Sequence, residues 1–221
     1  MSELPRITRT NTIECSFSTI KEATAVIYGL SYTKKMPGAS YGLPASACLV
    51  GGILAMMPGT TCSKCYAKKG HYRFNNVKIA QRIRLQAITN PKWSYAMAHI
   101  INSENQQWFR WHDSGDLQGV WHLLKIIEVA NLCPNTQFWL PTSELKIVKA
   151  VHGKISIPKN LVIRISAAMI DGDVTESYPH TSSVTLDEAK ATCPATKQGG
   201  QCGWCRNCWD AKIPTVTYLH H

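Results

Sequence analysis

The fold is decided by residues 108–143, which read WFRWHDSGDLQGVWHLLKIIEVANLCPNTQFWLPTS. Trp108–Trp111 and Gln137–Leu140 are short apolar runs, a pattern typical of buried strands. Between them, apolar residues recur at helical spacing to about Ala130, and Pro134 follows the expected end of the helix. The stretch therefore predicts a strand, a helix and a second strand.

The same alternation continues on the C-terminal side. Leu161–Ile165 is a third apolar run, and a short helix is expected near residues 144–151 before it. The three strands begin about 25 residues apart with helices between them, which is the βαβ pattern of a parallel sheet. Further helices are predicted near residues 19–27 and 76–88, and from Pro91 to about Ile101.

The length of 221 residues fits a single sizeable domain, and no repeat, low-complexity tract or clear linker divides it. Residues 1–70 are predicted to be its loop-rich N-terminal part, because Pro and Gly are frequent between residues 37 and 60. Residues 190–210 form a C-terminal cysteine-rich segment. We therefore expect one α/β domain, residues 1–221, with a parallel sheet and a metal-binding segment near its end.

Polar and small residues follow each predicted strand. Asp113, Ser114, Gly115 and Asp116 come after the first strand, and in parallel sheets functional groups collect at the carboxyl ends of the strands. Asp113 and Asp116 are therefore candidate catalytic residues, and Ser114, Gly115 and Asp116 candidate cofactor-binding residues. Gly115 would allow close backbone approach, and either Asp would take an ammonium group or ribose hydroxyls. Alternatively, Ser114 or Asp116 caps a helix that begins near Leu117.

Four cysteines close to the C-terminus have metal-ligand spacing. Cys193 is followed by Cys202, Cys205 and Cys208, the last three at successive two-residue intervals. This spacing favours a ferredoxin-type iron–sulfur cluster, because three such thiolates wrap one loop around a cluster face. Structural zinc is the alternative, and the absence of metal is a third. A closed four-thiolate site would serve structure or electron transfer.

A second cysteine group consists of Cys48, Cys62 and Cys65. Three thiolates leave one iron of a four-iron cluster open to an external ligand, the arrangement that chemistry on a small molecule needs. The alternatives are that Cys62 and Cys65 form half of a zinc site, or that Cys48 is simply buried. Cys15 and Cys133 are expected to be small core residues.

The positive charge is concentrated in one window. The chain has 24 Lys and Arg against 14 Asp and Glu, yet no acidic residue lies between Glu22 and Glu104. A local positive field suits phosphates, an anionic cofactor or nucleic acid, although a basic face that only aids solubility is the alternative. The candidate nucleic-acid contacts are Lys64, Lys68, Lys69, Arg73, Lys78, Arg82 and Arg84.

Nothing in the chain predicts a membrane span, since no apolar run reaches roughly 18 residues. The first residues lack the pattern of a secretory signal, and the nine cysteines are odd in number. We therefore expect a reducing, cytoplasmic compartment, in which grouped cysteines more often bind metal or catalyse than form disulfides.

Several motifs together resemble one known family. The chain is similar to the phage-encoded Gene product 88 family over roughly residues 40–218. The resemblance implies a phage or prophage origin and the host bacterial cytoplasm as working compartment. The motifs that carry it are Tyr41–Ala45 leading to Cys48, Cys62–Ala67 with Gly70 and Tyr72, Trp111–Asp116, and Cys193-Pro194 with Cys202, Cys205, Cys208 and Trp209.

A more distant similarity is to radical SAM enzymes. It implies a partial (β/α) barrel-like sheet, with Cys48, Cys62 and Cys65 as the cluster cysteines and Ser114, Gly115 and Asp116 matching the glycine-acid motif that helps to hold S-adenosylmethionine (SAM). The spacing here is C-x13-C-x2-C, whereas that family has C-x3-C-x2-C, so only the second interval agrees.

Together these observations favour an iron–sulfur protein with one or two 4Fe-4S clusters that acts on a nucleotide or nucleic acid. The resemblance to radical SAM enzymes implies SAM as its co-substrate. The first alternative is a non-catalytic module that is stabilised by zinc or an iron–sulfur cluster and that binds nucleic acid or a host protein. The second is an electron-transfer protein.

Overall fold

The structure, a computed structural model, describes residues 16–220 and is built on one seven-stranded sheet. The strands lie in chain order; β1 pairs antiparallel with β2 and every other neighbouring pair is parallel. They are β1 (Ser31–Tyr32), β2 (Ala39–Tyr41), β3 (Trp108–Trp111), β4 (Gln137–Thr142), β5 (Leu161–Ile170), β6 (Thr181–Thr185) and β7 (Thr215–Leu219).

Helices fill the connections in the first two thirds of the chain. The α-helices are α1 (Ile20–Ile27), α2 (Val50–Leu54), α3 (Asn75–Ala87), α4 (Trp93–Ser103), α5 (Val120–Leu132) and α6 (Leu145–Val151). Short 3-10 turns are η1 (Ala45–Ala47), η2 (Tyr66–Lys68), η3 (Gly70–Arg73), η4 (Glu188–Lys190), η5 (Pro194–Gln198) and η6 (Asn207–Trp209). None of the helices in residues 16–220 is both long and apolar enough to cross a membrane.

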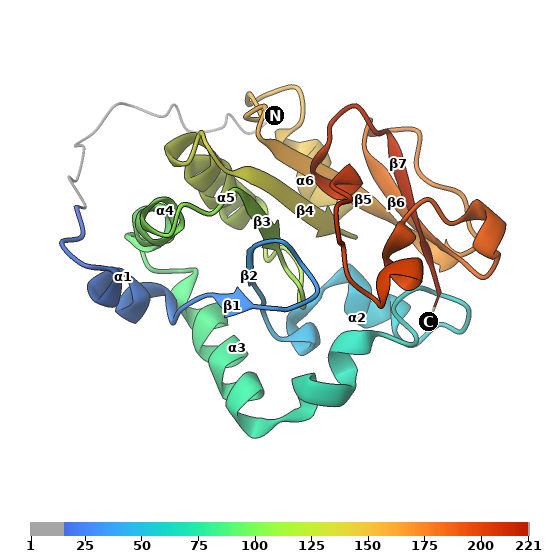
Figure 1. Cartoon of the computed structure of the whole chain (residues 1–221), viewed down its shortest axis with the longest axis horizontal. Coiled ribbons are helices and arrows are strands. Elements are labelled where there is room, and N and C mark those ends of the chain that lie inside the picture. The colour runs from blue at the N-terminus through green and yellow to red at the C-terminus, as the bar shows by residue number, and fades with distance from the viewer. Residues whose placement is uncertain (1–15, 221) are drawn as a thin grey trace, which may run out of the picture.

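One face of the sheet is covered by helices. Figure 1 shows α4, α5 and α6 on one side of β3, β4 and β5, with α1 beside α4. Phe109, Trp111, Phe138 and Leu140 alternate along β3 and β4 and are buried in this layer, as the period of a strand requires. The main hydrophobic core therefore lies between the sheet and these helices.

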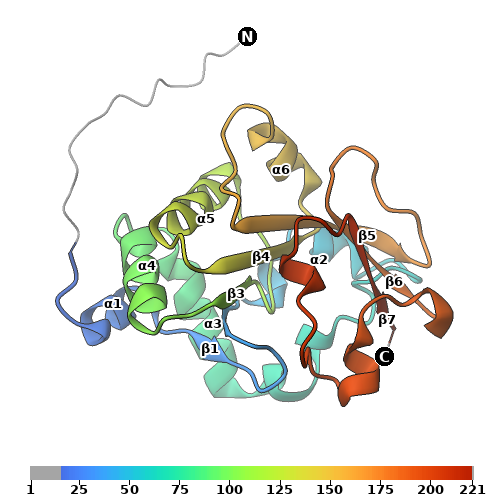
Figure 2. The ribbon, with the colours of Figure 1, turned by 45° about the horizontal axis from the view of Figure 1, so that its top comes forward.

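The opposite face carries the C-terminal segment. Trp139 and Trp209 stack there edge to face, with ring centroids 5.3 Å apart, and Val216 and Cys208 complete a second, smaller core. Figure 2 shows this segment folding back over the β4–β7 half of the sheet before β7 is added at its edge. Two layers thus flank one sheet, and the cysteine-rich segment is one of them.

Most of the predicted elements are present. The strands expected at 108, 137 and 161 and the helices near 19–27, 76–88 and 144–151 agree with the structure to within a few residues, and the sheet is mostly parallel. The helix expected to begin near Leu117 begins at Val120 instead, because Gly119 has an extended backbone with φ 156°. Residues 37–60 were predicted as mostly loop, and within this range the structure has the short elements β2 and α2.

Candidate functional site

The carboxyl ends of β2, β3, β4 and β5 meet at one edge of the sheet. His112–Asp116 follows β3, Thr142–Glu144 lies at the end of β4, and Ala167–Ile170 ends β5. Hydrogen bonds cross between these segments, so they form one polar rim. This rim contains all of the Asp, Ser and Gly candidates from the sequence.

Asp116 ties the ends of β3 and β4 together. Its Oδ1 accepts hydrogen bonds from Thr142 Oγ1 at 2.6 Å and Leu117 N at 2.8 Å, and its Oδ2 accepts from Ser143 N at 2.8 Å. Burial raises the pKa of Asp116 to about 6, although these donors act in the opposite direction. Asp116 is therefore a buried, fully bonded carboxyl group, and it does not cap α5.

Glu144 is a site residue that sequence reasoning missed. It is buried, and its Oε1 accepts a hydrogen bond from Val50 N at 2.7 Å across 94 residues of chain. Val50 is the first residue of α2 and comes two residues after Cys48. Glu144 thereby anchors the Cys48 segment to the end of β4. Its position directly after a predicted strand is the feature of the sequence that could have identified it as a site residue.

Asp113 is held by two tyrosines. Tyr72 donates to Asp113 Oδ2 at 2.9 Å, and Tyr66 donates to the carbonyl oxygen of Asp113. Burial raises the pKa of both tyrosines, so their hydroxyls stay protonated and remain donors. The other carboxylate oxygen, Oδ1, is buried without a hydrogen-bond partner in residues 16–220. Asp113 therefore keeps an unused acceptor.

Ser114 and Gly115 bind another part of the chain itself. Ser114 Oγ donates to Leu43 O and accepts from Gln81 Nε2, both at 2.7 Å. Gly115 has φ +77°, and a Cβ there would lie 2.6 Å from Leu43 Cβ, closer than atoms pack. The close backbone approach predicted for Gly115 is thus made by Leu43. A cofactor contact at Ser114 or Gly115 stays a prediction.

Cys48, Cys62 and Cys65 come together at this rim. Thr61 N donates to Ala168 O at 2.9 Å, which places the Cys62–Cys65 turn against the end of β5. A Cβ built on Gly51 would lie 3.5 Å from Cys62 Sγ and 3.7 Å from Cys48 Sγ. The two sulfurs therefore flank one small space beside α2, and Cys65 lies in the same turn as Cys62, where Cys65 N donates to Cys62 O at 3.2 Å. Joint binding of a cluster by the three thiols stays a prediction.

Burial makes two of these thiols costly to ionise. Burial, together with the nearby Asp116 and the two other thiols, raises the pKa of Cys48 to about 12. Burial also raises the pKa of Cys62, whereas Lys68 lowers it. Cys48 and Cys62 therefore favour the protonated thiol, and a bound metal cation would favour their thiolates.

The C-terminal cysteines form a separate group on the sheet face opposite the helices. Cys193 N donates to Thr217 O at 3.0 Å, and Cys208 Sγ lies 3.2 Å from Tyr218 Oη, both contacts to β7. Cys202 N donates to Lys35 O at 2.9 Å, so the β1–β2 loop closes over the group. Burial raises the pKa of Cys208 to about 12.

Arg164 holds this C-terminal segment in place. It projects from β5, is fully buried, and donates to the carbonyl oxygens of Asn207, Cys208 and Asp210 at 2.8–3.0 Å. Its Nη1 also donates to Ile213 O at 3.0 Å. One guanidinium therefore organises the loop that carries Cys208.

Arg110 lies between the two cysteine groups. Its Nη2 donates to Tyr66 Oη at 2.9 Å, next to Cys65, and its guanidinium stacks 4.6 Å from the Trp139 ring centroid. Burial raises the pKa of Cys202 and Cys208, and Arg110 acts in the opposite direction on both. Arg110 therefore supplies positive charge to the space between the groups.

Cysteine sulfurs are the ligands that iron–sulfur clusters use, but the side chains are not arranged to bind a single metal ion. Within residues 16–220, no three His, Cys, Asp or Glu side chains are arranged to hold a metal ion. The cysteines of both groups are free thiols gathered within electrostatic reach of one another. Metal binding by the C-terminal cysteine-rich segment and by the first cysteine group stays a prediction.

The seven basic residues proposed to contact nucleic acid do not share one environment. Arg84 is buried, and its Nη1 donates to Ser31 Oγ at 2.7 Å. The other six are exposed; they are Lys64, Lys68, Lys69, Arg73, Lys78 and Arg82. They follow one another from the Cys62–Cys65 turn along η2, η3 and α3, so the exposed positive charge begins beside the first cysteine group.

Comparison with known proteins identifies the family. A family model described as Gene product 88 matches residues 17–211, and the chain belongs to this family. No curated protein and no solved structure matches the chain. The family resemblance expected from the motifs is thus confirmed, whereas the similarity to radical SAM enzymes receives no support from these comparisons.

Proposed function

We propose that this member of the Gene product 88 family is an iron–sulfur protein that resembles radical SAM enzymes and modifies a nucleotide or nucleic acid. Cys48, Cys62 and Cys65 would hold a reactive cluster with one open iron. Cys193, Cys202, Cys205 and Cys208 would hold a closed, auxiliary cluster. When bound, the open cluster supplies electrons and a free coordination position to a co-substrate such as SAM.

The observation that carries the proposal is the meeting of Cys48, Cys62 and Cys65 at the carboxyl edge of a parallel sheet. That edge is where ligands bind in α/β folds, because the strand ends and following loops leave polar groups there. The strands also follow each other in chain order, as they do in a (β/α) barrel, which supports the expected partial barrel.

The residues around the three thiols have distinct positioning tasks. Glu144 holds the start of α2 and hence the Cys48 segment. Asp116 fixes the β3 loop to β4 beside it, and Lys68 offsets negative charge near Cys62. The rim would thus hold the ligand thiols in place before a cluster binds, which reduces the ordering cost of binding.

Six exposed basic residues beside the first cysteine group support an anionic substrate. Lys64, Lys68 and Lys69 lie in or next to the Cys62–Cys65 turn. Phosphate contacts by Lys and Arg are salt-dependent and independent of base sequence. Binding of a labelled single-stranded oligonucleotide should therefore weaken steeply as salt is added, and Lys68→Ala with Lys69→Ala should flatten that dependence. Salt-independent binding would contradict this role.

Metal analysis of protein purified without oxygen tests the proposal. We expect about eight irons with matching sulfide per chain, as two four-iron clusters require. Addition of SAM to the reduced protein should then change its electron paramagnetic resonance spectrum, because SAM would occupy the open iron. Zinc without iron would contradict the proposal, and an unchanged spectrum would exclude SAM as co-substrate.

A binding module without catalysis is the second candidate, and one observation favours it. Trp204 lies between Cys202 and Cys205 and is 81% exposed. An exposed tryptophan ring offers a platform on which a nucleic-acid base can stack. Zinc content together with oligonucleotide quenching of Trp204 fluorescence would support this module over the enzyme.

The family supports a proposal about origin and compartment. A phage gene product would act in the cytoplasm of the infected bacterium, where reducing conditions keep thiols available for metal. We propose this compartment for the chain.

A further inference from the structure

Five large apolar side chains beside the first cysteine group are exposed. They come from α2, from the residues that flank it and from the end of β5, and their exposed fractions run from 42% to 78%. A single exposed apolar residue needs no explanation, but a group of them on adjoining segments is typical of an interaction surface. We call these residues the apolar patch: Leu49, Ile53, Met56, Met57 and Met169.

Thr60 joins the segments that carry the apolar patch. Its Oγ1 donates to Leu54 O at 2.6 Å and to Met57 O at 2.9 Å, at the end of α2. Thr60 also forms a β-bridge with Met169, and a Cβ built on Gly59 would lie 3.2 Å from Met169 Cε. The segment after α2 is therefore in contact with the end of β5, and the patch extends over both.

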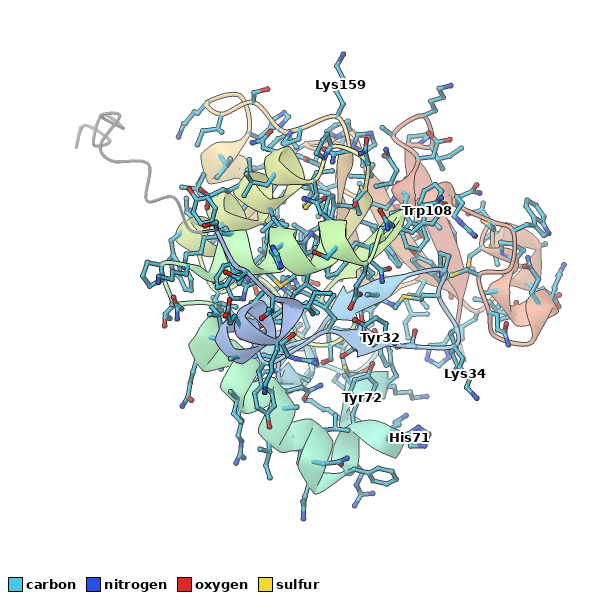
Figure 3. All side chains as sticks on the ribbon, turned by 60° about the vertical axis from the view of Figure 1, so that its left-hand side comes forward. Tyr32, Lys34, His71, Tyr72, Trp108 and Lys159 are labelled. Atoms are coloured by element: carbon cyan, nitrogen blue, oxygen red, sulfur yellow. The ribbon has the colours of Figure 1, made fainter. Side chains whose placement is uncertain are left out.

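Positive charge borders the apolar patch. Ser63 N donates to Thr60 Oγ1 at 3.1 Å, so the exposed Lys64 comes one residue after the point where the patch segments join. The exposed Lys68 follows in η2, and Figure 3 labels His71 on η3, through which the basic segment continues to α3. This segment belongs to the part of the sequence that has no Asp or Glu. An apolar surface and a positive border therefore lie side by side.

We propose that the apolar patch binds the unstacked bases of a single-stranded nucleic acid whose phosphates lie on the adjacent lysines. This inference rests on the proposed function and specifies its substrate. Every nucleobase has an apolar face, which stacking covers in a duplex and leaves free in a single strand. Phosphates alone would pair with the lysines and leave the patch uncovered, whereas an uncharged apolar partner would leave the lysines unpaired. A strand with free bases covers both.

The apolar patch would also place a base beside the first cysteine group. Leu49 directly follows Cys48 in the sequence. A Cβ built on Gly51 would lie 3.5 Å from Cys62 Sγ, and Ile53 follows Gly51 by two residues on α2. A base on the patch would therefore lie next to the thiols that are proposed to hold the reactive cluster.

The test compares three labelled DNAs of equal length in binding to the full-length protein, purified without oxygen. They are a mixed-sequence single strand of about 12 nucleotides, its duplex, and an abasic strand that keeps the phosphates but lacks the bases. Fluorescence anisotropy at one salt concentration should show at least tenfold tighter binding of the single strand than of either other DNA.

The outcomes separate this inference from the proposed function. Equal binding of the duplex or of the abasic strand would overturn the inference and leave an anionic substrate in place. Failure of all three DNAs to bind would contradict both the inference and the proposed nucleic-acid substrate. The iron count of the same preparation reports on the cluster independently of any DNA.

Variants of the apolar patch distinguish contacts to bases from contacts to phosphates. Ile53→Ser combined with Met56→Ser removes the two most exposed side chains of the patch and leaves every thiol and lysine in place. This double variant should lower the preference for the single strand over the abasic strand at least fivefold, with unchanged affinity for the abasic strand. Leu132→Ser is the matched control, since Leu132 is an exposed apolar residue at the end of α5, and it should keep the wild-type preference. A wild-type preference in the double variant would refute the role of the patch.

Discussion

The two cysteine groups are held in different ways by the same sheet. Cys48, Cys62 and Cys65 lie on loops at the carboxyl edge, where exposed apolar side chains such as Met56 (78% exposed) surround them. On one face of the sheet, Cys193, Cys202 and Cys208 pack with Trp139, Trp209 and Val216, and Cys205 is buried in the same segment. One group borders solvent and a polar rim, whereas the other is part of a hydrophobic core.

Under the proposed function, this difference corresponds to two roles, one in chemistry and one in stability. A site that works on a substrate needs access and polar neighbours, which the edge provides. A packed site with a buried guanidinium behind it contributes to the stability of the fold, as structural metal sites do. We call Cys48, Cys62 and Cys65 the edge group, and Cys193, Cys202, Cys205 and Cys208 the face group. We expect disturbance of the face group to unfold the protein, and disturbance of the edge group to leave the fold largely intact.

The largest effect is expected from Arg164→Met. The substitution leaves the buried carbonyls of Asn207, Cys208 and Asp210 without their donor, so we expect a loss of about 3–5 kcal/mol in the free energy of unfolding. Denaturant unfolding measures this. Lys212→Met, at an exposed position of the same segment, is the control and should change stability little. Equal stability of both variants would show that the face group is not held by Arg164.

A smaller effect is expected from the titration of Asp116 at the edge. Its pKa is about 6 in the folded protein and 3.8 in the unfolded chain, so the folded protein binds this proton more tightly. Stability contributed by the protonated form is present below pH 4 and is lost as the pH rises to 6, by about 3 kcal/mol at most.

Unfolding of metal-free protein at several pH values tests this titration. Asp116→Asn should remove this part of the pH dependence, and Asp173→Asn, at an exposed position, should retain it. The same pH profile in wild type and Asp116→Asn would refute the raised pKa.

The smallest effect is expected from Glu144→Ala. Loss of the acceptor for Val50 N should cost about 1.5 kcal/mol and speed amide hydrogen exchange in residues 48–54. Exchange in residues 202–209 should stay at the wild-type rate, because that segment is held by Arg164. Glu188→Ala, which removes only an exposed ion pair with Lys197, is the control. Faster exchange in both segments would show that the two groups are coupled.

The elements that sequence reasoning predicted are those with local periodicity. Phe109 and Trp111 alternate with half-buried neighbours along β3, and the apolar stripe of α5 repeats at helical spacing. β6 and β7 were missed because they are rich in Thr and Ser. These polar residues pair across the sheet, as Thr181 Oγ1 and Thr215 Oγ1 do at 2.8 Å.

The candidate site depended on contacts that no local pattern contains. The 13 residues between Cys48 and Cys62 are compatible with joined or separate thiols. The hydrogen bonds of Thr61 to Ala168 and of Val50 to Glu144 bring them together, each across about 90 residues or more of chain. The spacing of the cysteines therefore left open whether Cys48 joins Cys62 and Cys65, and only tertiary contacts bring the two segments to the same edge.

Iron and sulfide counts in three proteins purified without oxygen test the central claim, that the edge group holds a cluster of its own. We predict about eight irons per chain in wild type and about four in Cys48→Ala. Cys133→Ala is the control, because Cys133 is a buried core residue away from both groups, and it should keep about eight. A wild-type count in Cys48→Ala, or zinc in place of iron in the wild-type protein, would contradict the account.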